Sequence, residues 1–227
     1  MKKATLFTIL ILSILLSFSC SSDSDDPVNE NTEDVIIAED DSTWVDLGLP
    51  SGIKWARYNV GAEKPEDYGD YFAWGETETK DYFWMSTYIF AHPGEKGRWI
   101  FDRLDDFSGN PRYDAATANW GAPARTPMLN ECKELVENCK WQETTQNGVN
   151  GMLATGPNGK NLFFPYAGDF VDARLEGDGD RGSYMSSTPN ESDEYMACSL
   201  SLGVLGNVEY HDESPRVLGE TVRPVKN

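Results

Sequence analysis

A change of composition at Cys20 constrains this chain of 227 residues more than any other feature. Two lysines stand near the start, an apolar run extends from Leu6 to Leu16, and a small residue comes directly before Cys20. A positive head, a short apolar middle and a small residue before the cut are typical of a secretory signal. A transmembrane helix is the alternative, but the run is about half of the roughly 20 apolar residues that span a bilayer. We therefore expect residues 1–19 to be a cleaved signal.

The segment Leu16–Cys20 resembles the lipobox of bacterial lipoproteins. In that family the cysteine thiol is lipidated and becomes the mature N-terminus, so the resemblance implies a multiply acylated Cys20. Because a single acyl chain holds a protein only marginally, multiple acylation would provide stable anchoring. The resemblance thus implies that the chain is attached to the outer membrane by lipid.

Residues 20–42 are predicted to be a disordered acidic tether. Positions 21–42 hold nine acidic residues and no basic or aromatic one, so they cannot bury enough surface to offset the entropy of ordering. An acidic patch folded against the domain is the alternative. An acidic run after a lipidated cysteine resembles the signal that sends lipoproteins of the Bacteroidetes to the cell exterior. The sequence Asp41-Ser42-Thr43 resembles the O-glycosylation acceptor of the same bacteria, which implies Ser42 and Thr43 as glycosylation candidates.

The charge balance restricts the partners of the chain. The formal net charge is -19, and loss of the signal with its two lysines makes it still more negative. Such a charge disfavours nucleic-acid phosphates and anionic lipid headgroups. Apart from Cys20, an odd number of cysteines remains, which excludes a scaffold held together by disulfides: Cys132, Cys139 and Cys198.

Residues 43–227 show the pattern of one α+β domain with mostly short antiparallel strands, one clear amphipathic helix and long loops. Alternation predicts that 195–202 is a strand with one buried face. The helix is expected to begin at Thr126-Pro127, with threonine as the cap and proline in the first turn. The other strands are expected at 44–47, 53–59, 71–74, 84–90, 151–155, 161–164, 208–211 and 221–225.

Several motifs in 43–227 resemble the Fibrobacter succinogenes major paralogous domain, which is common in Bacteroidetes lipoproteins. The resemblance implies a fold similar to C-type lectin-like domains and to formylglycine-generating enzymes, with the last strand beside the first. It implies no particular activity, because the family has no established common one. The motifs are Trp44–Ala56, Asn59–Ala62, Pro65–Glu76, Ala118–Gly121, Arg125, Pro127, Gln146–Gly151, Gly182–Thr188 and Val222–Val225.

Residues 81–113 match that family least and form an aromatic-rich insertion. Aromatic rings offer a large contact area with a polar handle, so Trp84, Tyr88 and Trp99 are candidates for ligand binding. Ordinary packing in the core is the alternative. The expected ligand face combines this insertion with the loops at 172–182 and 188–194, the latter containing Asn190, and the loop at 212–219 is a further candidate.

The segment Gly177–Gly182 has the spacing G-x-G-x-x-G, but we reject a dinucleotide site there. That motif needs a helix after it, whereas residues 184–186 have the pattern of a strand, and two acidic residues would repel a pyrophosphate. Those residues, Asp178 and Asp180, begin like a calcium loop, but Pro189 stands where such a loop needs glutamate. A glycine-rich turn is therefore expected, with calcium as the alternative cofactor.

No catalytic or metal-binding constellation can be identified in the sequence. His92 and His211 are the only histidines, and they stand far apart without zinc-binding spacing. The three remaining cysteines lie on apolar faces, which predicts inert thiols rather than activated nucleophiles. We therefore expect a non-catalytic, cell-surface lipoprotein that binds an extracellular glycan or protein. A surface enzyme acting on polysaccharide or peptide, and a structural subunit of a surface assembly, are the alternatives.

Overall fold

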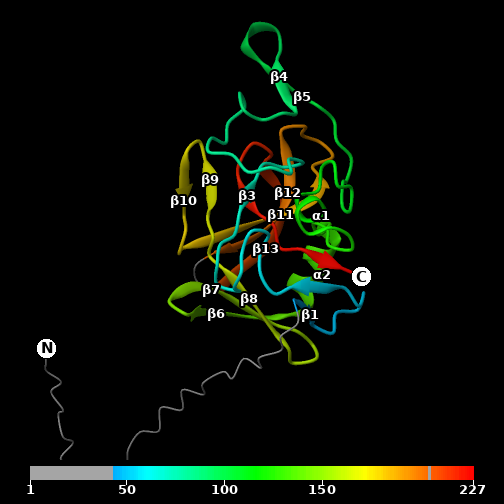
Figure 1. Ribbon diagram of the computed structural model, residues 1–227, viewed down its shortest axis with the longest axis vertical. Helices are drawn as coiled ribbons and strands as arrows, with labels where there is room; N and C mark the ends of the chain where they lie inside the picture. The colour runs from blue at the N-terminus through cyan, green and yellow to red at the C-terminus, as the bar shows by residue number, and fades with distance from the viewer. Residues whose placement is uncertain (1–42, 204–205) are drawn as a thin grey trace, which may run out of the picture. The chain divides into compact units, whose positions relative to one another are not determined.

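The computed structural model describes residues 43–203 and 206–227. Cys20, Ser42 and the predicted signal and tether lie outside the described residues. Within those residues the chain forms five small sheets and two α-helices (Figure 1). The expected α+β class with mostly short antiparallel strands is confirmed, but the expectation of one clear helix is wrong.

The two ends of the described domain meet in a three-stranded antiparallel sheet of order β1-β2-β15. Val45 and Val225 both pair with Trp55, and all three side chains are buried. The last strand therefore lies beside the second strand rather than beside the first, because Trp55 occupies the centre between two valines. The bounds are Trp44–Asp46 for β1, Lys54–Ala56 for β2 and Val225–Lys226 for β15.

The largest sheet has the order β13-β12-β11-β14-β3 and is antiparallel except where β14 pairs with β11. The alternation predicted for 195–202 forms β12, and Cys198, Leu200 and Leu202 are buried as expected. The opposite face is covered as well, since Ala197 packs in a second core with Trp74. The strands are Tyr71–Phe72 (β3), Arg181–Pro189 (β11), Met196–Gly203 (β12), Asn207–Pro215 (β13) and Glu220–Thr221 (β14).

A third sheet, β6-β7-β8, contains the strands predicted at 151–155 and 161–164, which pair with each other, and one strand that was not predicted. The unpredicted strand, β6, is mostly polar and exposed, so it carries little hydrophobic signal. Its turn into β7 uses Asn147 and Gly148, both with positive φ, as a two-residue hairpin requires. The strands are Lys140–Gln146 (β6), Val149–Thr155 (β7) and Asn161–Pro165 (β8).

The longer helix, α2 (Leu129–Asn138), begins later than expected, with Met128 at the N-cap position. Thr126 is not the cap, because its hydroxyl and its backbone N–H both donate to Asp114. The Glu131 carboxylate accepts from the Met128 backbone N–H and so satisfies one of the free donors at the helix start. Cys132 and Leu135 are buried on the predicted apolar stripe.

The shorter helix, α1 (Ala115–Trp120), was not predicted from the sequence. Asp114 caps it, since its Oδ1 atom accepts from the backbone N–H groups of Ala116 and Thr117. Only six residues long, it shows too little periodicity to be recognised. It packs its alanines against Trp74 and Phe107 in the second core.

The insertion 81–113 projects at the top of the view in Figure 1 as the hairpin β4–β5, Ala91–Pro93 and Trp99–Phe101. The strand expected at 84–90 is absent from the described residues, where this stretch forms turns. A single 3₁₀ turn, Glu95–Gly97, joins the two strands. A further pair, β9 (Asp169–Val171) and β10 (Arg174–Glu176), bridges to the insertion between Asp172 and Phe83.

Glu220 on β14 is buried, and we predict that it makes stability depend on pH. Burial raises the pKa of this carboxyl from about 4.5 to about 7, while a hydrogen bond from the Ser214 hydroxyl opposes the rise and Asp169 adds to it. Between these pH values the folded protein keeps a proton that the unfolded chain has lost, so stability falls as pH rises. The full effect is about 3 kcal/mol.

Urea unfolding of the wild type and of Glu220→Gln at pH 5 and pH 8 measures this effect. The wild type should lose about 2 kcal/mol relative to the variant over that interval. A constant difference between the two proteins would contradict the assignment. Glu191→Gln is the matched control, because Glu191 is exposed.

Candidate functional site

A pocket of about 460 Å³ lies where three distant segments meet, and we call it the Arg216 pocket. The segments come from the insertion, from the loop after β11 and from the residue that follows β13. They include parts of three of the segments expected to form the ligand face. The lining residues are Arg103, Leu104, Asp105, Asp106, Thr188, Pro189, Asn190, Glu191, Glu194 and Arg216.

Arg216 contributes a buried cation to this pocket. The residue is 2% exposed, and its guanidinium stacks 4.1 Å from the centre of the Trp74 ring. Nη1 donates to the carbonyl oxygen of Asp102 at 3.0 Å, whereas Nε is buried and has no hydrogen-bond partner among the described residues. Burial lowers the pKa of Arg216, against the weaker influence of nearby groups including Glu194. The pocket thus contains a positive charge that is poorly compensated.

Two other arginines, the partly buried Arg125 and the buried Arg223, make more contacts with the protein, although Nη2 of Arg223 has no hydrogen-bond partner among the described residues. Arg125 forms a bidentate ion pair with Glu131, at 2.7 and 2.8 Å. Arg223 has no carboxylate partner among the described residues, but it donates to Asn59 and to the carbonyl oxygens of Ala56, Arg57 and Phe163. No carboxylate of the described chain lies within ion-pair distance of Arg216. Arg216 donates one hydrogen bond whereas Arg223 donates four, and Arg216 lies in the wall of a pocket, so an external partner could reach Arg216 and supply the compensation that the protein does not.

Asp106 fixes one wall of the pocket to the end of β11. Its carboxylate accepts from the hydroxyls of Ser187 at 2.8 Å and Thr188 at 2.6 Å, and from the backbone N–H of Ser108. The Thr188 hydroxyl in turn accepts from the backbone N–H of Leu129 at the start of α2. The wall therefore has a defined geometry although it comes from two separate loops.

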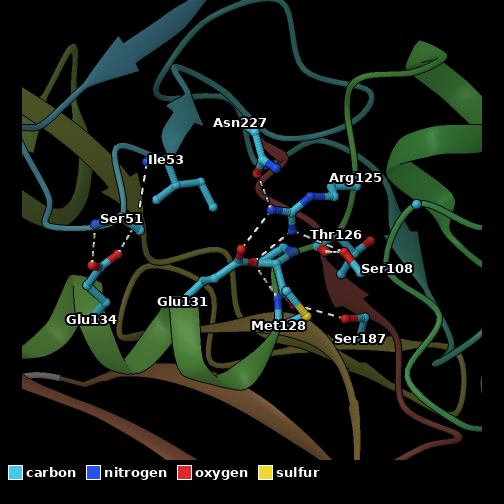
Figure 2. A network of polar contacts seen from close by, with 12 residues as sticks. Ser51, Ile53, Ser108, Arg125, Thr126, Met128, Glu131, Glu134, Ser187 and Asn227 are labelled. Carbon is cyan, nitrogen blue, oxygen red and sulfur yellow. Dashed lines mark hydrogen bonds and ion pairs between the residues drawn. The ribbon is translucent and has the colours of Figure 1, made fainter.

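Behind this wall, a polar network holds the insertion to the rest of the domain. Figure 2 shows Arg125 between Glu131, Ser108 and Asn227, and it donates to all three. The Ser108 hydroxyl donates to the carbonyl oxygen of Thr126 at 2.6 Å. These contacts join the end of the insertion to the start of α2 and to the last residue of the chain. They make the wall rigid before any ligand arrives.

The rim of the pocket is mostly acidic. Asp105, Glu191 and Glu194 are exposed, and their carboxylates accept no hydrogen bond from the described residues. Asn190 shapes the rim, because its Oδ1 atom accepts from the backbone N–H groups of Ser192 and Asp193 and closes a turn. Arg103 is the only basic residue that lines the rim. The pocket therefore has a positive interior and a negative entrance.

Of the predicted ligand-binding residues, only Asn190 lines the Arg216 pocket. Trp84 is 40% exposed in a turn and Trp99 is half-buried on β5, whereas Tyr88 is buried in the core and donates to the carbonyl oxygen of Trp74. Tyr88 is therefore a core residue, whereas the exposure of Trp84 leaves it accessible to a ligand. Arg216 was missed because one arginine in a loop carries no signal of its burial.

The segment Gly177–Gly182 forms the expected glycine-rich turn after β10 and continues into the first two residues of β11. A strand follows it instead of a helix, as the rejection of a dinucleotide site required. Asp178 and Asp180 are exposed and line neither of the two pockets described here. No group of three or more histidine, cysteine or acidic residues within 43–203 and 206–227 is arranged to hold a metal ion.

Nucleophilic candidates are buried or partly buried in the described domain. Burial raises the pKa of Cys139 to about 11 and raises that of Cys132 further, which disfavours thiolates. Ser199 Oγ lies 3.1 Å from His211 Nε2, but Ser199 is 0% exposed. His211 Nδ1 accepts from the Glu213 backbone N–H, so Nε2 carries the proton in neutral imidazole and cannot act as a base toward the serine. This pair is not built for nucleophilic attack.

A second, more open hollow of about 340 Å³ lies beside the first described residues. Its aromatic residues Trp44, Tyr58 and Trp120 pack edge to face, with ring centres 5.5 to 6.0 Å apart. Thr43, a glycosylation candidate, also lines it. Charged side chains do not line this hollow within the described part of the chain, so it offers less for recognition than the Arg216 pocket.

No helix in the described residues is both long and apolar enough to cross a membrane. Comparison of the chain with protein-family models, curated proteins and solved structures finds no match.

Proposed function

We propose that this chain is a cell-surface lipoprotein, anchored through Cys20 in the outer membrane, whose domain binds an extracellular ligand in the Arg216 pocket. The observation that carries the proposal is a buried arginine without a carboxylate partner in the wall of a pocket. With a single hydrogen bond to the protein, this charge is compensated less than that of Arg223, so a bound anionic group would stabilise it. No activated nucleophile accompanies it in the described residues, so binding is favoured over catalysis.

The proposal includes the resemblance to the major paralogous domain and its C-type-lectin-like fold. Two features support this. The first and last described strands lie in one sheet, and loops separated by long stretches of sequence meet at the ligand pocket. In Figure 1 the β4–β5 hairpin lies at the top of the view, whereas β1 lies toward the bottom.

Cys20→Ala is expected to release the full chain from membranes. Loss of the acylated thiol removes the hydrophobic anchor, and the remaining acidic chain has no affinity for anionic lipid. Fractionation of the producing bacteria, with protease treatment of intact cells, measures both anchoring and exposure. Cys139→Ala is the control and should stay in the membrane fraction. Unchanged membrane recovery of Cys20→Ala would contradict the lipid anchor.

A ligand screen separates the proposed function from its alternatives. The full chain in non-ionic detergent is applied to arrays of glycans and peptides, beside Arg216→Met and the remote variant Arg174→Met. Binding by the wild type and Arg174→Met, with loss in Arg216→Met, is the expected result. Turnover of an arrayed compound would favour the enzyme. Self-association without any bound compound would favour the structural subunit.

A further inference from the structure

The charges of the Arg216 pocket are arranged with the positive group inside and the negative groups at the entrance. We propose that the pocket binds a zwitterion, whose carboxylate pairs with Arg216 and whose ammonium group lies against the acidic rim. This inference rests on the proposed function of the pocket. It goes further by naming the ligand chemistry, which is shared by free amino acids and short peptides.

The geometry of the Arg216 guanidinium favours a ligand with a carboxylate. Nη1 already donates to the Asp102 carbonyl oxygen, and the stack on Trp74 fixes the plane of the group. Nη2 donates to no described residue and is not one of the buried atoms lacking a partner, so it faces accessible space. A planar guanidinium held in this way suits a carboxylate oxygen. A neutral ligand would leave the buried charge uncompensated.

The acidic residues at the rim of the Arg216 pocket favour a ligand with an ammonium group. Asp106 is already engaged by Ser187 and Thr188, but Asp105, Glu191 and Glu194 keep their acceptor capacity. Among the residues described at the rim, only Arg103 carries a positive charge that partly offsets these carboxylates. A simple anion would have to pass these carboxylates and enter a chain of net charge -19. A ligand with its own positive group removes that repulsion, since like charges at an entrance slow association and opposite charges speed it.

The size of the pocket distinguishes the two sources of a zwitterion. A volume of about 460 Å³ falls within the range of pockets that bury drug-sized ligands. A free amino acid would leave much of this volume to water, whereas a peptide of about three small residues fills such a pocket. The peptide also separates its two charges along the path from the interior to the rim. We therefore expect a tripeptide to bind more tightly than the amino acid.

The test uses calorimetry of the full chain in non-ionic detergent with four probes. These are trialanine, its C-terminal amide, its N-acetyl derivative and free alanine. Amidation removes the carboxylate and should weaken binding about 30-fold or more. Acetylation removes the ammonium group at an exposed rim and should weaken binding about fivefold. Free alanine should bind more weakly than trialanine.

Matched variants show which residue is responsible for each loss of affinity. In Arg216→Met the acid and the amide should bind equally weakly. In the double variant Glu191→Gln/Glu194→Gln the free and acetylated peptides should bind alike, while Asp180→Asn should behave as the wild type. Thermal unfolding confirms that each variant folds, and the exposed glutamates can be replaced without disturbing the core.

Any one of three results would contradict the proposal that the ligand is a zwitterion. The amide could bind the wild type as tightly as the acid, folded Arg216→Met could keep full affinity, or no probe could bind at millimolar concentration. Glucuronic acid and a neutral trisaccharide are tested in parallel. If either binds and loses affinity in Arg216→Met, the pocket remains a binding site and only the zwitterion is wrong. If affinity for every ligand is independent of Arg216, both proposals fail.

Discussion

Arg223→Met is expected to lower the free energy of unfolding by about 4 kcal/mol. Arg223 is 0% exposed, and although burial lowers its pKa to about 10 it stays cationic at neutral pH. Its guanidinium stacks 4.6 Å from the Phe164 ring and donates to Asn59 and three backbone carbonyl oxygens. Methionine fills a similar volume but removes these four hydrogen bonds. Urea unfolding followed by circular dichroism measures the loss.

Arg174→Met is the matched control for this prediction. Arg174 is exposed on β10, so the same chemical change should alter stability by less than about 0.5 kcal/mol. Should Arg223→Met fail to fold, Arg223→Lys retains the charge and part of the hydrogen bonding and is expected to lie between the two. A loss below about 1 kcal/mol in Arg223→Met would show that these carbonyl oxygens find other donors.

Asp114→Ala is expected to have a comparable effect, a loss of about 4 kcal/mol. The Asp114 carboxylate is 0% exposed and accepts hydrogen bonds from five donor groups. Two of them start α1, two belong to Thr126, and one belongs to Gly109 at the end of the insertion. Alanine would leave these donors buried without an acceptor. It would also remove the contact that joins the start of α1, Thr126 and Gly109.

Asp114→Asn and Asp105→Ala are the controls for this second prediction. Asparagine keeps one acceptor oxygen and is expected to lose about half as much stability as alanine does. Asp105 is exposed at the rim of the Arg216 pocket, so its replacement should leave stability nearly unchanged. Equal unfolding midpoints for Asp114→Ala and Asp105→Ala would contradict the central role of Asp114.

The elements with strong periodicity could be predicted from the sequence. The alternation of 195–202 and the two short apolar stretches at 151–155 and 161–164 are local patterns that predict strands, and these strands form. The helix α1 and the strand β6 could not be predicted, because α1 is short and β6 is mostly polar and exposed. The spacing of Thr126 predicts a helix cap, whereas Asp114, twelve residues earlier, binds it instead.

The candidate site could be predicted only at the level of its segments. The insertion and the loops at 188–194 and 212–219 were named, and each contributes to the pocket. Arg216 was not named, because its burial depends on Trp74, which comes from another part of the chain. The loop at 172–182 was named on its acidic and glycine-rich composition, yet it lines no wall of this pocket. The amino-acid composition of a segment indicates that it is an exposed loop, but it does not determine which loops come together to form a pocket.

Arg216 is expected to acquire a counter-ion from a bound ligand. The direct measurement is nuclear magnetic resonance of the arginine Nε–H groups in the isotopically labelled full chain, titrated with the tightest ligand from the screen. The Arg216 signal, identified by its absence in Arg216→Lys, should shift on binding while the signals of Arg125 and Arg223 stay in place. Saturating ligand that leaves the Arg216 signal unmoved would contradict the account.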